Sequence, residues 1–126
     1  MTAESAAAPP ATVPPATRLT RRQDFLLVLQ DGQRVRHPLL GFGFRPNGLE
    51  QSRVGFAVGK RVGNAVTRNL VRRRLRAITR ATALVPGYDI VVTARQNAAM
   101  ARYGELEQAF RQCARRGTLL AAEAAR

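Results

Sequence analysis

Acidic residues are scarce in this chain, which has eight Asp and Glu against 21 Lys and Arg and a net charge of +13. Lysine is nearly absent too, because 20 of the 21 basic residues are arginine. The planar guanidinium group pairs with phosphate and stacks on bases better than an ammonium group does. No acid lies between Glu50 and Asp89, a stretch that holds nine basic residues. The sequence therefore predicts an electropositive surface with nucleic acid as its partner.

Long apolar runs are also missing. No uninterrupted run approaches the roughly 20 residues of a membrane-spanning helix, so we expect a soluble protein with no membrane partner. The lone cysteine, Cys113, cannot form an internal disulfide, and it lies in an apolar helical stripe where we expect a small core residue. Residues 1–17 match neither a secretory signal nor a mitochondrial presequence. These absences favour a cytoplasmic location.

The side chains of an acid–base site are equally sparse. The acids are scattered, and Glu105 and Glu107 are two apart on a predicted helix, so they point to different sides. His37 is the only histidine. It lies before Pro38 without an obvious partner, which favours a surface or turn role. We expect no catalytic residue and no metal site in the protein, and an independent nuclease is disfavoured.

The composition divides the chain into three parts. Residues 1–17 are rich in Ala and Pro and predict a disordered tail, because two Pro-Pro pairs prevent a helix. Residues 18–117 predict a single RNA-binding domain, and residues 118–126 a C-terminal tail. With 45% apolar residues the chain can bury a core.

Periodicity predicts the elements of that domain in the order α-β-β-β-α-β-α. Thr20 and Gln23 form a candidate capping box for the first helix, which Gly32 ends. A short strand is possible at 33–37, and the alternating segments 40–44 and 54–58 predict a hairpin around Pro46-Asn47-Gly48. Asn64 is a candidate cap for a helix that runs to about Leu84. A strand at 88–95 and a last helix follow.

The helix after Asn64 has one cationic half and one apolar half. At about 100° per residue, one half collects Arg68, Arg72, Arg76, Asn69, Arg80 and Arg73. Arg74 is the exception, and its stem must extend along the apolar side to reach water or an acceptor. A solvated face without a ligand is the alternative, but such faces normally mix charge signs at i, i+4 spacing. A polyanion would relieve the repulsion between these arginines.

The segment 60–76, KRVGNAVTRNLVRRRLR, resembles the signature of the bacterial ribonuclease P protein subunit, and the similarity extends from about Arg18 to Arg116. Leu70 departs from the polar or basic residue that usually follows Arg-Asn in that family, and the wheel turns it toward the core. The resemblance implies an α+β fold, a small two-layer α/β sandwich with a left-handed β-α-β crossover, like the second domain of ribosomal protein S5.

The resemblance also implies a function. The family's protein is the non-catalytic subunit of an endoribonuclease that removes the 5′ leader of precursor tRNA, and the RNA subunit carries the chemistry. The expected partners are ribonuclease P RNA, bound 1:1, and precursor tRNA, with Mg²⁺ held mainly by RNA. Contacts to the catalytic RNA are implied for Lys60, Arg61, Asn64, Arg68, Asn69, Arg72, Arg73 and Arg76.

A cleft between the first helix and the sheet is implied as the site of the single-stranded leader, with Phe25 and Leu29 at the positions of two family aromatics. Leu29 keeps apolar contact but loses a stacking face. Phe25 could alternatively be plain core, because an apolar helical stripe is usually buried. For the whole protein, the rival interpretation is a ribosomal-type structural RNA-binding protein.

Overall fold

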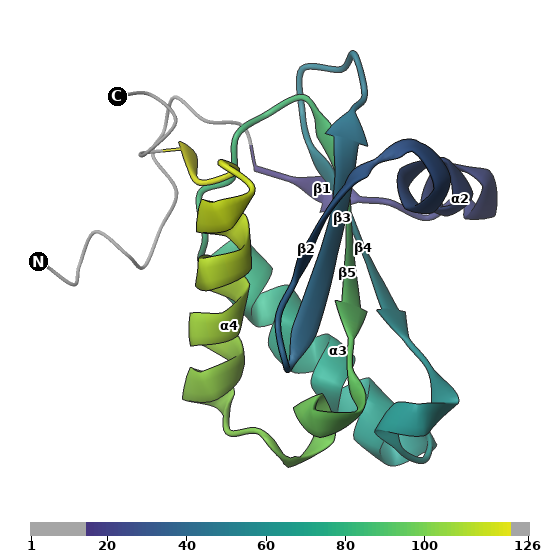
Figure 1. Cartoon of the computed structure of the whole chain (residues 1–126), viewed down its shortest axis with the longest axis vertical. Coiled ribbons are helices and arrows are strands. Elements are labelled where there is room, and N and C mark those ends of the chain that lie inside the picture. The colour runs from purple at the N-terminus through teal and green to yellow at the C-terminus, as the bar shows by residue number, and fades with distance from the viewer. Residues whose placement is uncertain (1–14, 122–126) are drawn as a thin grey trace, which may run out of the picture.

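The computed structural model describes residues 15–121, in which a five-stranded mixed sheet has helices on both faces (Figure 1). The predicted α+β class and element order are confirmed, with one additional short strand at the start. Most of the two predicted tails, residues 1–14 and 122–126, lies outside the described residues. The elements are β1 (Thr17–Arg18), α2 (Arg22–Asp31), β2 (Gln33–Arg36), β3 (Leu40–Pro46), β4 (Arg53–Val58), η1 (Lys60–Val62), α3 (Ala65–Arg80), β5 (Tyr88–Ala94), η2 (Gln96–Met100) and α4 (Tyr103–Arg116).

The strands lie in the order β1-β4-β5-β3-β2. β2 and β3 form an antiparallel pair, whereas β3 and β4 do not pair with each other, so the predicted hairpin of segments 40–44 and 54–58 is wrong. β5 lies between them, antiparallel to β3 and parallel to β4. β4, α3 and β5 therefore form a β-α-β unit, which carries α3 across one face of the sheet.

β5 is central because its apolar residues serve both faces. Ile90, Val91 and Val92 are consecutive and each is 0% exposed. Such a continuous apolar run is typical of a strand covered on both sides, whereas the segments of β3 and β4 alternate with small residues. The turn chemistry of Pro46-Asn47-Gly48 reverses the chain, but pairing is decided by burial of β5.

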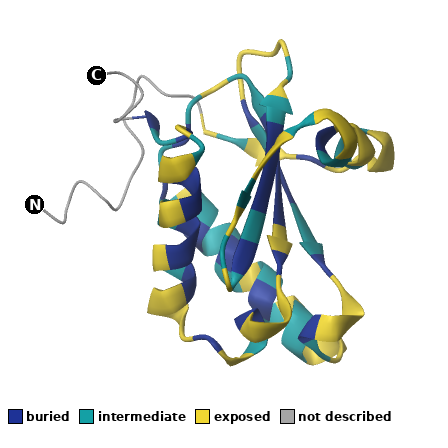
Figure 2. Ribbon diagram, in the orientation of Figure 1, coloured by how far each residue is buried: buried dark blue, intermediate teal, exposed yellow. Residues whose placement is uncertain are grey.

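The two faces of the sheet have separate cores. Figure 2 shows buried residues along the strands of the sheet and exposed ones on the outer sides of α2 and α4. Phe42 and Phe44 point to the face that α3 and α4 cover, and the Phe42 ring meets Phe110 of α4 edge-on with centroids 5.0 Å apart. Val91 points to the opposite face, where it packs with Leu19 and Val28 of the α2 region. α2 thus covers part of the sheet face that lies opposite α3 and α4.

Local signals at the helix ends were partly misleading. Asn64 caps α3 as predicted, since its side-chain oxygen accepts from the Thr67 N–H at 2.9 Å. The capping box at Thr20 is wrong: the N-cap of α2 is Arg21, without a side-chain bond. The chain stays extended up to Leu19, whose N–H donates to the Val54 carbonyl of β4. This contact sets the start of α2.

Both ends of the folded part extend beyond the expected limits. Thr17 and Arg18 pair in parallel with β4 as strand β1, which the sequence pattern did not predict. The helix expected to run to about Leu84 is shorter, because α3 ends at Arg80. Leu84 forms a β-bridge with Leu120, near the C-terminal end of the described residues. Leu119 is 1% exposed, so the core continues past Gly117 into the segment expected to be a tail.

His37 and Cys113 both contribute to the packing of the fold. His37 accepts from the Leu39 N–H at Nδ1, and its Nε2 lies 3.1 Å from the Gln112 side-chain oxygen, so it fixes the turn between β2 and β3 onto α4. Cys113 is a buried core residue, as expected. None of the helices between residues 15 and 121 combines the length and apolar character that a bilayer crossing requires.

We expect the stability of the fold to decrease between about pH 9 and pH 11 because of Cys113. Burial raises the pKa of its thiol to about 11 from 9.0, against a smaller lowering by Arg116. The unfolded chain loses this proton first, so the free energy of unfolding falls by up to about 1.4 kcal/mol per pH unit in this window.

Urea unfolding of the chain and of Cys113→Ala at pH 7 and at pH 10.5 measures this effect. The stability advantage of the natural cysteine over alanine should shrink at the higher pH. An advantage of equal size at both pH values would contradict the burial of the thiol.

Candidate nucleic-acid interface

The apolar side of α3 packs against the main core, which leaves the opposite side of the helix available for a partner. Val71, Leu75 and Ile78 are the buried residues of this helix and face the main core. Asn64 satisfies one of the free N–H groups at the first turn. The backbone of Gly63, the residue before Asn64, lies close to the Thr67 side chain, and a Cβ at this position would lie 2.9 Å from it. The helix start and its rotation are therefore fixed by packing.

The predicted cationic half of α3 faces outward. Asn69, Arg73 and Arg80 are exposed, while Arg68, Arg72 and Arg76 are half-buried. Among residues 15–121, no carboxylate lies within ion-pair distance of an arginine of α3. We call Asn69 and these five arginines the arginine face.

Two protein contacts orient the guanidinium group of Arg72. One nitrogen donates to the Asn69 side-chain oxygen at 3.1 Å and another to the Val58 carbonyl at 3.4 Å. Val58 ends β4, so Arg72 leans over the open edge of the sheet. Leu70 is half-buried at the margin of the apolar side.

Arg74 does not belong to the arginine face, as the wheel predicted. It is half-buried and donates to the Ala101 carbonyl at 3.2 Å, in the segment between η2 and α4. Its stem follows the apolar side of α3 and its head finds a backbone acceptor. This contact gives Arg74 a role in joining α3 to the η2 segment.

Lys60 and Arg61 are exposed on η1, which the buried side chain of Val62 anchors to the core. The arginine of the neighbouring segment, Arg95, lies with them around a surface hollow of about 690 Å³. This hollow lies where β4 and β5 end, next to the first turn of α3. The structure thus brings the predicted basic residues of the loop close to those of the helix start.

Phe25 and Leu29 are one turn apart on α2 but line different hollows. The Phe25 ring lies directly on Gly55 of β4, because a Cβ at that glycine would come within 3.0 Å of three ring atoms. Phe25 borders a hollow of about 320 Å³ that Arg72 and Arg76 also line. Leu29 borders a second hollow of about 350 Å³ over Gly43 of β3. The predicted cleft is thus two hollows on either flank of α2.

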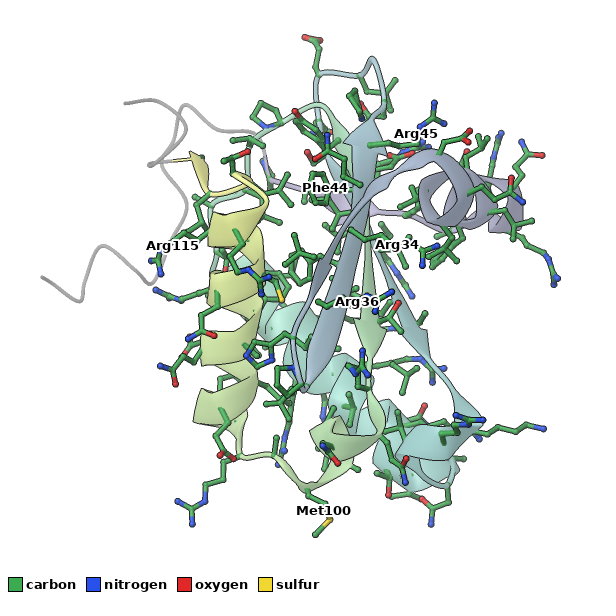
Figure 3. All side chains as sticks on the ribbon, in the orientation of Figure 1. Arg34, Arg36, Phe44, Arg45, Met100 and Arg115 are labelled. Atoms are coloured by element: carbon green, nitrogen blue, oxygen red, sulfur yellow. The ribbon has the colours of Figure 1, made fainter. Side chains whose placement is uncertain are left out.

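Three arginines around the Leu29 hollow were not singled out from the sequence. Arg34 and Arg36 of β2 and Arg95 after β5 line it, and Figure 3 shows the two β2 side chains beside the sheet. Arg34 also donates to the Leu29 carbonyl and so fixes the end of α2. The alternation of arginine with Val35 was the available signal, since Val35 packs against the main core.

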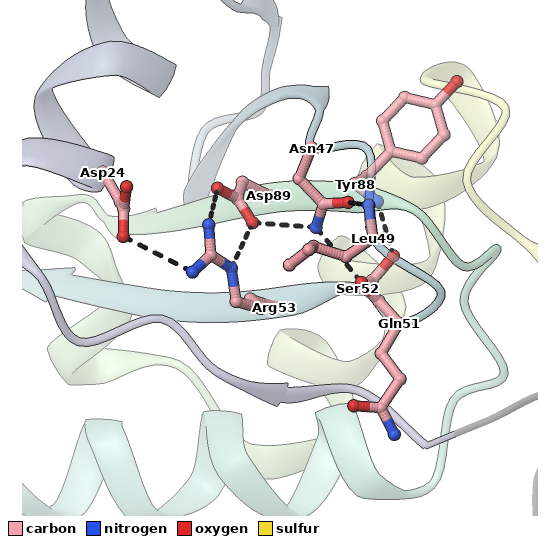
Figure 4. A network of polar contacts seen from close by, with 8 residues as sticks. All are labelled: Asp24, Asn47, Leu49, Gln51, Ser52, Arg53, Tyr88 and Asp89. Carbon is pink, nitrogen blue, oxygen red and sulfur yellow. Dashed lines mark hydrogen bonds and ion pairs between the residues drawn. The ribbon is translucent and has the colours of Figure 1, made fainter.

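A network of charged groups fixes α2 to the sheet (Figure 4). Asp89 of β5 is 5% exposed and accepts two hydrogen bonds from Arg53 of β4, at 2.7 and 2.6 Å. Arg53 also pairs with Asp24 of α2 at 3.4 Å, and Asn47 donates to Asp89 at 3.0 Å. The hydrogen bond to Asp89 and the two carboxylates raise the pKa of Arg53.

Asp24 directly precedes Phe25 in α2, so its ion pair with Arg53 orients the helix that carries the aromatic ring. Sequence reasoning missed this network because its members come from three separate elements. The scarcity of acids was the available signal, because each of the few carboxylates in so basic a chain is a candidate partner for an arginine. In residues 15–121, no three His, Cys, Asp or Glu side chains group as metal ligands would.

The fold and the arginine face define a class of small, strongly basic α+β proteins suited to a polyanionic partner. The family model described as Ribonuclease P matches residues 13–117. The chain belongs to this ribonuclease P protein family, and it is therefore a component of the enzyme ribonuclease P, which implies an RNA partner and a role in tRNA processing.

Individual relatives agree with this assignment. The ribonuclease P protein component of Dehalococcoides mccartyi (strain CBDB1) is 46% identical over 93 residues, which cover 74% of this chain and 78% of the relative. The RNase P protein from Thermotoga maritima superposes with a TM-score of 0.70 at 30% identity, covering 75% and 92% of the two chains. The Staphylococcus aureus RNase P protein shares the fold, with a TM-score of 0.76 at 24% identity over 83% and 98%.

Proposed function

We propose that this chain binds the catalytic RNA of ribonuclease P and the 5′ leader of precursor tRNA, and so assists removal of the leader to give the mature tRNA 5′ end. The arginine face is the observation that carries the proposal. Its arginines have no carboxylate partner among the described residues, although like charges at i, i+4 spacing destabilise a helix. RNA phosphates would supply the missing counter-charge.

The contacts to the catalytic RNA are assigned to two adjoining parts of the surface. The η1 segment presents Lys60 and Arg61, and α3 presents the arginine face directly after it. Asn64 uses its side-chain oxygen as the helix cap, which leaves its amide N–H groups to donate to RNA. The α3 residues assigned to the catalytic RNA are Arg68, Asn69, Arg72, Arg73 and Arg76.

The leader is assigned to the α2 side of the sheet. Phe25 offers an aromatic ring for stacking, and Leu29 an apolar contact beside the arginines of β2. We assign Mg²⁺ and the cleavage step to the RNA. Among residues 15–121, no three His, Cys, Asp or Glu side chains lie together as metal ligands would. The complex is proposed to be 1:1 with the RNA and cytoplasmic.

Salt titration of binding to ribonuclease P RNA tests the arginine face. If about six phosphates are engaged, log K should fall with log salt at a slope of roughly −4 to −5. Arg73→Ala should weaken binding and flatten the slope by somewhat under one unit, because Arg73 is exposed and its removal leaves packing intact.

Arg74→Ala is the control on the same helix, since its guanidinium group is engaged with the Ala101 carbonyl. It should lower thermal stability more than Arg73→Ala does and should leave the salt slope unchanged. Equal changes of slope for the two variants would contradict the assignment of the face.

A further inference from the structure

Two glycines lie under α2, one on each side of a central valine. Val91 of β5 pairs with Gly55 of β4 on one side and with Gly43 of β3 on the other. Residues paired across neighbouring strands point to the same face of a sheet, and Val91 packs with side chains of α2. The three residues therefore form one row across the sheet face that α2 covers. We call Gly55 and Gly43 the glycine pair.

Each member of the glycine pair lies close to one side chain of α2. A Cβ at Gly55 would come within 3.0 Å of three atoms of the Phe25 ring, and a Cβ at Gly43 would lie 3.3 Å from Cγ1 of Val28. Non-bonded carbon atoms attract each other best at about 3.5–4.0 Å. α2 therefore rests on the backbone of β4 and β3 at these two positions, and a side chain at either would push it outward.

The neighbouring row of the same sheet face is charged and fixes the start of α2. Arg53 of β4 pairs with Asp89 of β5 and also reaches Asp24 of α2 at 3.4 Å. Gly55 follows Arg53 by two residues, so both face α2. β4 thus contacts α2 twice, through an ion pair at Asp24 and through bare backbone at Phe25. The ion pair orients the helix, and the glycine sets the height of the ring above the sheet.

The height of α2 determines the shape of the two hollows on its flanks. Gly55 lines the hollow that Phe25 borders, and Gly43 lines the hollow that Leu29 borders. Each hollow is also lined by arginines, which come from the sheet and from α3 and not from α2. A displacement of α2 therefore moves Phe25 and Leu29 away from the arginines that complete each hollow.

We propose that Gly55 and Gly43 are positioning residues for recognition of the leader. Their lack of a side chain lets α2 lie against the sheet, which places Phe25 and Leu29 at the distance from the arginines that a single strand can span. Dispersion contacts depend steeply on distance, since a gap of about 0.5–1 Å loses a quarter to a half of the attraction. This inference rests on the proposed function and assigns a role to residues that offer RNA no side chain.

Gly55→Ala tests the proposal in the reconstituted holoenzyme. We expect the affinity for precursor tRNA to fall by about five- to a hundredfold, because the methyl group displaces the Phe25 ring, while the affinity for mature tRNA changes little. Gly43→Ala should cause a smaller loss in the same direction, since its Cβ meets Val28 less closely. Gly104→Ala is the control: this glycine lies in the first turn of α4, and a Cβ there has no atom within 4 Å.

A double variant, Gly55→Ala with Phe25→Ala, shows whether Gly55 acts through the ring. Once the ring is removed, the methyl group of the new alanine has room. Gly55→Ala should therefore lower the unfolding temperature of the natural chain but not that of Phe25→Ala. It should likewise add no further loss of precursor affinity to that of Phe25→Ala. Loss of stability alone would not change the preference for precursor over mature tRNA in folded protein.

The proposal is overturned if Gly55→Ala and Gly104→Ala bind precursor tRNA alike, or if the losses caused by Gly55→Ala and Phe25→Ala multiply. Equal losses for precursor and mature tRNA in folded Gly55→Ala also overturn it. Should Gly55→Ala not fold, Gly43→Ala and the double variant decide by the same criteria. If the holoenzyme of the natural chain does not prefer the precursor, the proposed function fails, whereas the unfolding temperatures still test the contact between Gly55 and Phe25.

Discussion

Phe25→Ala should weaken binding of precursor tRNA by the holoenzyme about five- to a hundredfold while binding of mature tRNA changes little. Only the precursor carries a single strand on which the ring could stack, and base stacking contributes roughly 1–3 kcal/mol. The ring is half-buried, rests on Gly55 and borders the hollow that Arg72 and Arg76 also line, so one part of it packs and another part faces the hollow.

The core alternative for Phe25 makes a different prediction. A ring that serves only as core would lose about 3–5 kcal/mol of folding stability on truncation and would affect both RNAs alike, through loss of folded protein. Phe25→Leu is the matched variant, since it retains apolar contact with Gly55. Precursor-specific loss in a folded Phe25→Leu protein supports the leader contact, and equal losses for the two RNAs would remove Phe25 from the site.

Asp89→Ala should cost about 3 kcal/mol of folding stability, the low end of the range for breaking a buried ion pair. The variant leaves Arg53 without its two strongest hydrogen bonds and Asn47 without one acceptor. The low end applies because the Arg53 side chain is 28% exposed and so regains water. Urea or thermal unfolding measures the loss.

Glu107→Ala is the control for Asp89→Ala. Glu107 pairs with Arg111 at 3.7 Å on the outside of α4, with both side chains more than a third exposed. Such a surface pair contributes at most a few tenths of a kcal/mol, so this variant should unfold almost as the natural chain does. Similar losses for the two variants would show that the network around Arg53 does not fix α2 to the sheet.

Features with a local cause were predictable from the sequence. Asn64 caps α3 because a side-chain oxygen at that position reaches an N–H three residues on, and this needs no information about the rest of the fold. The arginine face follows from helical periodicity alone. Arg74 was also predicted to lie off this face, although its acceptor, the Ala101 carbonyl, comes from a separate segment.

Features that depend on distant pairing were not predictable. The alternating segments around Pro46-Asn47-Gly48 fit a hairpin, but β5, more than 30 residues later, enters between them because its apolar run can be buried on both faces. β1 is two residues long and exists only through its pairing with β4. For the same reason, the position of Arg18 at the hollow that Phe25 lines could not be predicted from the sequence pattern.

The network of Asp24, Arg53 and Asp89 shows the same limit for the site. Each residue alone reads as an ordinary surface charge, since they are separated by 29 and 36 positions in the chain. The fold brings them together and uses two of its few acids to hold the helix of Phe25. Composition could indicate that such acids are notable, but it could not indicate their partners.

Reconstitution tests the central claim most directly. The protein is added to a bacterial ribonuclease P RNA and precursor tRNA at low Mg²⁺, and 5′ cleavage is measured with and without each component. The account predicts that the protein enhances cleavage at the mature 5′ end when the RNA is present and produces none without it. No enhancement would favour a structural RNA-binding protein, and cleavage by the protein alone would place the chemistry in this chain, so either result would contradict the account.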